Sequence, residues 1–197
     1  MKKVFLFLTA FAFTIGFSAN AQTFITPGIK AGANVSNYIL KDLSGADSNM
    51  KAGASVSSFV NFEFSEWFSL QPEIGFHYRN SEFKGTGKKN DMEYWGADLL
   101  VYSTGQMTFN NGGKIYLGLG PYVGYGFSLK NTSDDINLYK EDQMKRFDFG
   151  AALLLGYEFR FGLQVNASYK TGFLDLTDKA LGKMRTQVVG LGVGYRF

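Results

Sequence analysis

Ten charged residues of both signs, distributed along the chain, could interact with one another, and the single histidine belongs to the same set. In a narrow, water-poor space such cations and carboxylates are tolerated when they are paired and hydrogen-bonded. We expect them to form an ion-pair cluster that fills the interior of the protein; a gated polar path or a proton relay is the functional alternative. The set comprises Lys30, Glu63, Glu73, His77, Arg79, Asp98, Asp148, Glu158, Arg160, Lys170 and Arg196.

His77 shares a strand-like spacing with Glu73 and Arg79, as a base and an orienting acid would. The chain has 1 histidine and 0 cysteines. Only His77 could therefore act as a base histidine, and thiolate metal sites and cysteine nucleophiles are excluded. A histidine that donates to a neighbouring carboxylate is the simpler interpretation. We predict that the protein is not an enzyme and has no catalytic residues, no metal and no cofactor.

Composition restricts the class of protein further. The 197 residues are 17% aromatic and only 19% charged, which argues against a disordered chain. The formal net charge of +3 is small and dispersed, so we expect no nucleic-acid partner.

The N-terminus has the pattern of a secretory signal peptide. Lys2 and Lys3 precede an uncharged apolar run over 4–17, and Ala19 and Ala21 supply the small residues of a cleavage site. The apolar run is shorter than the ~20 residues that a membrane-spanning helix needs. We therefore expect residues 1–21 to be removed and residues 22–197 to form a single exported domain.

Bulky apolar residues then recur at every second position, with no charge among them. A period of two indicates strands whose two faces meet different surroundings. The intervening positions are polar or small, so we expect the bulky side chains to lie on one face of each strand. The apolar rows lie within 25–35, 52–64, 68–78, 95–101, 117–127, 147–159, 163–169 and 189–197.

These two faces favour a membrane barrel over a soluble, lipocalin-like barrel. The interior of a barrel of about eight strands is only just wide enough for side chains to fill, so rows of Phe, Tyr and Leu would overfill it. A Lys or Arg that faces lipid at the midplane costs about 2–4 kcal/mol. The apolar face should therefore meet lipid, and the fold class is an all-β, antiparallel, up-and-down transmembrane β-barrel of eight strands.

The expected connections alternate between long and short, as in a barrel with long outer loops and short periplasmic turns. They are Asn37–Asn49, Ser65–Glu66, Ser81–Asp91, Thr108–Lys114, Lys130–Lys145, Arg160–Gly162 and Leu174–Met184.

The strand assignment gathers aromatic residues into two belts, as at two membrane interfaces. Pro72 and Pro121 fall inside strands, where each removes a ladder hydrogen bond, so we expect a bulge or a locally broken ladder at each. The turn-side belt comprises Phe24, Phe62, Phe64, Trp67, Phe68, Tyr157, Phe159, Phe161, Tyr195 and Phe197. The loop-side belt comprises Tyr38, Phe76, Tyr78, Trp95, Tyr125, Phe127, Phe147, Phe149 and Tyr169.

Segments 28–34, 70–76 and 119–125 resemble the PorT-like outer-membrane β-barrel family. The resemblance extends over essentially the whole mature chain. The resemblance implies a location in the outer membrane. The family includes members that are linked to protein secretion and gliding. The ending 189–197 resembles the C-terminal signal that the outer-membrane assembly machinery reads, with Val193, Tyr195 and Phe197 as its apolar and aromatic positions.

The resulting hypothesis is an integral outer-membrane barrel with a structural, adhesive or assembly role, its lumen plugged by ion pairs. The alternatives are a component of a transport or protein-secretion complex, and a soluble periplasmic ligand-binding barrel. The expected partners are outer-membrane lipid, the assembly machinery during insertion and, for the first alternative, a secretion complex.

Overall fold

A computed structural model describes residues 23–41, 47–85, 88–131, 136–139, 144–176 and 183–197. The predicted signal peptide, residues 1–21, lies outside these ranges. Within them, no helix has the length and apolar character needed to cross a membrane. The strands are β1 (Phe24–Lys41), β2 (Asp47–Ser65), β3 (Phe68–Gly85), β4 (Lys88–Thr108), β5 (Lys114–Asn131), β6 (Ile136–Asn137), β7 (Phe147–Glu158), β8 (Leu163–Gly172) and β9 (Lys183–Arg196).

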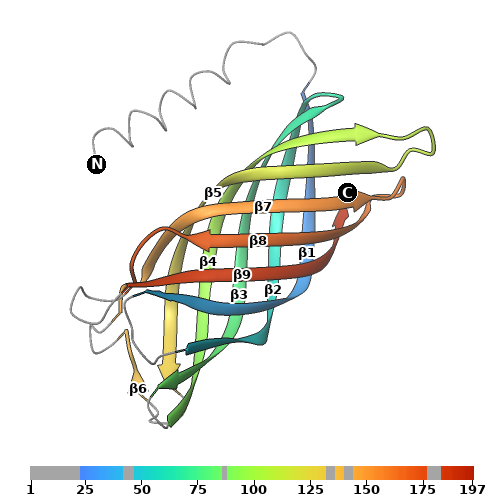
Figure 1. The fold of residues 1–197 in the computed structure, drawn as a ribbon. Helices are drawn as coiled ribbons and strands as arrows, with labels where there is room; N and C mark the ends of the chain where they lie inside the picture. The colour runs from blue at the N-terminus through green and yellow to red at the C-terminus, as the bar shows by residue number, and fades with distance from the viewer. Residues whose placement is uncertain (1–22, 42–46, 86–87, 132–135, 140–143, 177–182) are drawn as a thin grey trace, which may run out of the picture.

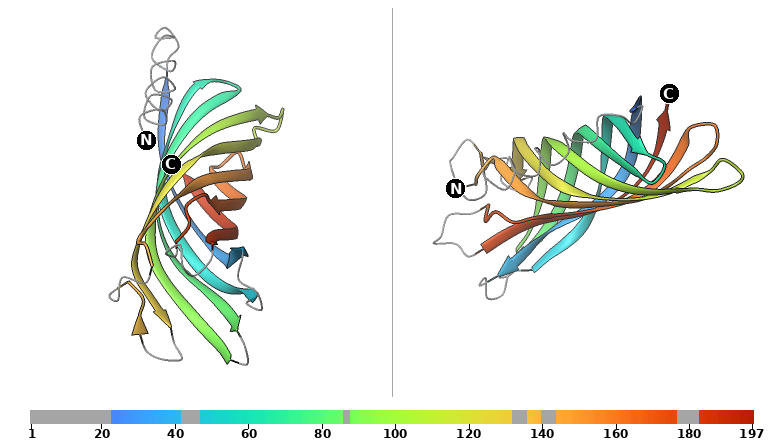
Figure 2. Two further views of the ribbon diagram at one scale, coloured as in Figure 1. Left: turned by 60° about the vertical axis from the view of Figure 1, so that its left-hand side comes forward. Right: turned by 90° about the horizontal axis from the view of Figure 1, so that it is seen from above.

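The long strands close into one antiparallel barrel (Figure 1). Each strand pairs with the next along the chain, with β5 followed by β7, and β1 pairs with β9 from Gly28↔Arg196 to Lys41↔Lys183. The short β6 pairs with the end of β5 and, among the described strands, with no other. The barrel therefore has eight strands, as predicted, and Figure 2 shows them curving around a shared interior.

The two faces of each strand differ as the alternation predicts. Ile29, Leu117 and Leu191 point outward and are 52%, 58% and 68% exposed. The charged Lys30 and Asp98 point inward and are buried. A soluble barrel with an apolar interior would show the reverse arrangement, so that alternative is wrong.

One end of the barrel, here called the turn end, carries the short connections and the C-terminus (Figure 1). Two of its turns share one geometry: Phe109 N–H donates to Gly113 O at 2.8 Å, and Phe159 N–H donates to Leu163 O at 2.8 Å. Gly112 and Gly162 in these turns have φ of 79° and 89°, a conformation that favours glycine. The opposite end, which carries β6, is the loop end.

The strands run farther into two expected loops than predicted. β1 continues to Lys41 and β2 begins at Asp47, while β3 and β4 continue to Gly85 and from Lys88. The expected loops Asn37–Asn49 and Ser81–Asp91 are therefore mostly strand. Cross-strand charge contacts support this extension, because Lys51 Nζ lies 2.7 Å from Asp91 Oδ2 and 4.0 Å from Glu82 Oε2.

Pro72 and Pro121 each interrupt one ladder without a bulge. The β2–β3 pairing runs to Phe59↔Glu73 and resumes in the same register at Phe62↔Leu70. The β4–β5 pairing has the same kind of gap around Pro121, whereas the β5–β7 pairing passes through it continuously. The missing proline N–H thus breaks the hydrogen-bond ladder on one side of the strand only. Of the two predicted outcomes, the structure shows the locally broken ladder and not the bulge.

Most of the expected belt aromatics lie on the outer wall, where several contact each other. The ring centroids of Tyr78 and Trp95 are 4.7 Å apart, and those of Tyr195 and Phe197 are 5.4 Å apart. Tyr38 is an exception, because it is buried in the barrel mouth. Its even position on β1, shared with Lys30 and Asn34, already predicts an inward side chain.

Candidate functional site in the barrel interior

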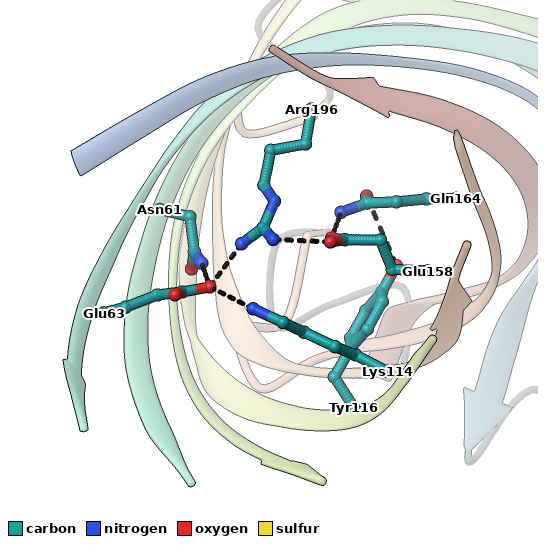
Figure 3. A network of polar contacts seen from close by, with 7 residues as sticks. All are labelled: Asn61, Glu63, Lys114, Tyr116, Glu158, Gln164 and Arg196. Atoms are coloured by element: carbon teal, nitrogen blue, oxygen red, sulfur yellow. Dashed lines mark hydrogen bonds and ion pairs between the residues drawn. The ribbon is translucent and has the colours of Figure 1, made fainter. Parts of the chain in front are cut away.

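A network of charged and polar side chains crosses the interior near the turn end (Figure 3). Arg196 of β9 reaches two carboxylates: it contacts Glu63 Oε1 through Nη1, and its Nη2 lies 2.5 Å from Glu158 Oε1. Lys114 Nζ of β5 adds a second cation 2.9 Å from Glu63 Oε1. Both carboxylates are thereby neutralised inside the barrel.

Uncharged partners complete this network. Asn61 donates to Glu63 Oε1 at 3.2 Å, and Gln164 donates to Glu158 Oε2 at 2.8 Å. Tyr116 O–H points to Gln164 Oε1 at 3.4 Å. The turn-end network, as we call these residues, joins side chains from β2, β5, β7, β8 and β9 across the lumen (Figure 3).

A second ion pair lies deeper in the barrel. Lys30 Nζ of β1 is 2.7 Å from Glu73 Oε2 of β3, and Ser57 of the intervening β2 donates to Glu73 Oε1 at 2.8 Å. The Lys30 ammonium also lies 4.7 Å from the centroid of the Phe59 ring. The cation is thus satisfied by a carboxylate and an aromatic face.

Asp98 of β4 is the centre of a third group, toward the loop end. Its Oδ2 lies 2.6 Å from Lys170 Nζ, and its Oδ1 lies 2.9 Å from His77 Nε2. Arg79 Nη2 is farther away, at 3.9 Å, and the Arg79 guanidinium stacks 4.1 Å from the Tyr94 ring centroid. His77 therefore faces a carboxylate, as in the simpler interpretation.

Asp148 and Arg160 complete the placement of the predicted cluster. Asp148 is buried and accepts hydrogen bonds from Tyr122 O–H at 2.8 Å and from the Phe149 N–H at 2.9 Å. Arg160 is not in the interior. It lies in the turn between β7 and β8 and is exposed, and its aliphatic chain lies beside Gly112. Its predicted place in the cluster is wrong because alternation ends where the strand does.

Large side chains share the interior with the charges, so the expectation that all bulky residues lie on one face is wrong. One cluster of them forms a wall from β4, β5 and β7. They fit because glycines lie opposite: a Cβ on Gly156 would lie 2.3 Å from the Tyr116 ring, and one on Gly150 would lie 2.7 Å from the Tyr122 ring. The wall consists of Leu100, Tyr102, Tyr116, Tyr122, Ala152 and Leu154.

The sequence already held signals for several of these interior residues. Tyr102 and Leu100 alternate in step with Asp98, and Tyr116 alternates in step with Gly118. Lys114, assigned by sequence to a turn, is the first residue of β5 and has the inward parity of Tyr116.

Buried apolar side chains gather at the loop end. Tyr139 and Leu176 belong to connections and not to the barrel strands, yet only 5% and 6% of their surfaces are exposed. The Leu138 N–H donates to Leu129 O at 2.9 Å, and the Leu176 N–H donates to Met184 O at 3.0 Å. Burial raises the pKa of the Tyr139 phenol, which keeps it protonated. The loop-end plug comprises Tyr38, Tyr94, Leu129, Tyr139, Leu176 and Met184.

Among the described residues, no group of three or more His, Asp or Glu side chains is arranged to hold a metal ion. The interior side chains neutralise one another's charges, and each layer joins strands that are distant in sequence.

Comparisons with known proteins agree with this architecture. Residues 11–178 match a family model described as outer membrane protein beta-barrel domain. The crystal structure of Neisserial surface protein A shares 12% sequence identity, with a TM-score of 0.53 over 87% of this chain and 97% of that one. OprG from Pseudomonas aeruginosa shares 18% identity, with a TM-score of 0.53 over 90% of this chain and 98% of that one. At these identities the likeness shows the fold. No curated protein sequence matches the chain.

Proposed function

The chain belongs to the outer membrane protein β-barrel domain family, and we propose that it is a closed barrel with a structural, adhesive or assembly role. As an integral outer-membrane barrel it presents an apolar wall to lipid. The narrower resemblance to PorT-like proteins stays a prediction, as does export by a cleaved signal peptide.

The filled interior carries this proposal. The turn-end network crosses the lumen at one end, and the loop-end plug occupies the other. Between them, the cavity lined by Lys30, Glu73 and Arg79 has a volume of about 60 Å³. A transport pore needs a continuous aqueous path, and the side chains packed in these layers are the reason to expect that this barrel has none.

Conductance in planar lipid bilayers tests the proposal. We expect the purified barrel to show no steady single-channel current, because ion pairs and rings fill its cross-section. A hollowed variant, Tyr102→Gly with Leu154→Ala, removes two side chains of the interior wall and should raise the current. A matched variant, Leu153→Ala, changes a lipid-facing side chain and should stay silent. A steady open pore in the unmodified barrel would contradict the closed lumen.

Site-specific photo-crosslinking in cells separates the possible roles. Met50 is exposed near the loop end, and Asn110 is exposed in a turn at the other end. An adhesive or structural role at the cell surface predicts adducts from a crosslinker at position 50. Membership of a secretion complex on the periplasmic side predicts adducts from position 110 and would favour that alternative.

We also propose that Val193, Tyr195 and Phe197 act as the signal for the assembly machinery. Their side chains are 54%, 42% and 67% exposed at the end of β9, where an assembly factor could contact them before the barrel closes. Replacing Phe197 with Ser should slow assembly in cells more than it lowers the stability of the folded barrel in detergent. An equal effect on both measurements would argue for a packing role alone.

A further inference from the structure

A small polar cavity lies inside the barrel, between the Lys30–Glu73 pair and the Asp98 group. Its volume is about 60 Å³. Its lining includes the small or amide side chains of Asn34, Ser55, Asn166 and Ser168, together with Arg79 and the charged Lys30, Glu73 and Lys170. The lining is therefore rich in hydrogen-bonding groups.

Arg79 is the least well compensated cation in the described interior. Lys30, Lys114 and Lys170 each have a carboxylate oxygen at 2.6–2.9 Å, and Arg196 contacts two carboxylates. Among the described residues, the nearest carboxylate oxygen to Arg79 is 3.9 Å from its Nη2.

That oxygen is Asp98 Oδ1, which also lies 2.9 Å from His77 Nε2, although neither of these two atoms makes a hydrogen bond to a described residue. The other carboxylate oxygen, Asp98 Oδ2, lies 2.6 Å from Lys170 Nζ. Stacking on Tyr94 offsets part of the cost of burying the Arg79 charge. A guanidinium that is only 6% exposed still lacks a close counter-ion.

Buried polar atoms of residues that line the cavity indicate which chemical group would fit there. Within the part of the chain that the structure describes, the buried donors Arg79 Nε and Asn166 Nδ2 have no hydrogen-bond acceptor, and the buried acceptor Asn34 Oδ1 has no donor. The Asn34 amide nitrogen donates to Tyr78 O at 3.3 Å. Buried polar groups are rarely left unsatisfied, so something that accepts hydrogen bonds should occupy this space.

We propose that the cavity binds one small monovalent anion, of halide or formate size, beside Arg79. Arg79 Nε and Asn166 Nδ2 would donate to it, and the hydroxyls of Ser55 and Ser168 are the nearby donors in the lining. A water needs about 10–15 Å³ of such space, so the cavity has room for an anion and a water that donates to Asn34 Oδ1. The anion completes the neutralisation of the buried guanidinium.

Glycines on β9 keep this space free. A Cβ on Gly190 would lie 2.7 Å from Ser168 Oγ, and one on Gly192 would lie 3.0 Å from Ala31 O and 3.2 Å from Asn166 Oδ1. A methyl group at Gly190 therefore narrows the cavity without touching Arg79, and Gly190→Ala is a variant that tests the space separately from the charge.

Bromide is a suitable probe because it scatters anomalously and matches the proposed size. Crystals of the full barrel grown in sodium bromide should show an anomalous peak beside Arg79 Nε and Asn166 Nδ2. In detergent, bromide should raise the midpoint of thermal unfolding saturably above that in sulfate at equal ionic strength. Ordered water alone at the site, with no difference between the two salts, would overturn the proposal.

Three variants sharpen this test. Arg79→Gln should weaken the apparent bromide affinity about tenfold or more, since it removes a charge-assisted hydrogen bond. Gly190→Ala should also weaken it, and this variant keeps the test decisive if Arg79→Gln fails to fold. Arg160→Gln, which changes an exposed arginine in a turn, should leave the bromide response unchanged. An equal bromide response in all three variants would contradict the assigned site.

Discussion

At the scale of single residues, the interior is organised by pairs that complement each other in charge or in size. Arg196 forms ion pairs with both Glu63 and Glu158, and Lys30 forms an ion pair with Glu73 across an intervening strand. Each of these charges depends on a partner because the side chains are mostly buried, with exposed fractions of 8–17%.

Replacing Arg196 with Gln should lower the free energy of unfolding by about 3 kcal/mol, because two carboxylates lose the cation between them. Arg160→Gln is the control, since this exposed side chain lies outside the interior. Urea titration of the detergent-folded barrel, followed by tryptophan fluorescence, measures both. Equal stability of the two variants would mean that the turn-end network contributes nothing to folding.

Size complementarity gives a second prediction. A Cβ on Gly156 would lie 2.3 Å from the Tyr116 ring, so Gly156→Ala should destabilise the barrel by about 1–3 kcal/mol through overpacking. Gly105→Ala should cost less, because the nearest atom to its Cβ would be 3.9 Å away. The same urea titration ranks the two variants, and the reverse ranking would refute the assigned packing.

At the scale of strands, the alternation of the two faces determines what each strand contacts. β7 shows this clearly: Leu153 points outward, whereas Ala152 and Leu154 are buried inside. The effect of a substitution at an outward position therefore depends on how well the new side chain is accommodated in lipid. At an inward position it depends on how well the new side chain fits the packed interior.

Leu153→Arg should impair insertion into lipid vesicles far more than Asn166→Arg. An arginine facing lipid near the midplane costs about 2–4 kcal/mol, whereas position 166 borders a polar cavity. The folded fraction on an unheated gel reports insertion of both variants. Equal loss of insertion would mean that the faces had been assigned backwards.

At the scale of the whole molecule, closure through β1 and β9 leaves no edge in the barrel and produces one apolar outer wall. The protein should therefore stay in the membrane fraction after carbonate washing and require detergent for extraction. Unheated samples should migrate differently from boiled ones on gels. Release into the aqueous fraction would contradict the membrane assignment.

The sequence by itself determined the strand class, the two faces and the number of barrel strands, because alternation with a period of two is a local property of the chain. It placed Lys30, Glu73 and Asp98 inside but gave no reason to pair them. The sequence interpretation also misplaced two residues. Arg160 lies in a turn, where the alternation has ended, and Tyr38 has the inward parity of β1, which was not followed to the end of that strand.

Only the tertiary structure decided which charges meet. Lys170 and Asp98 are 72 residues apart in sequence, and Arg196 and Glu63 are 133 apart. Their contacts depend on the register of every intervening strand pair, on closure of the barrel and on which glycines leave room for rings. These are properties of the whole closed sheet, so no local pattern specifies them.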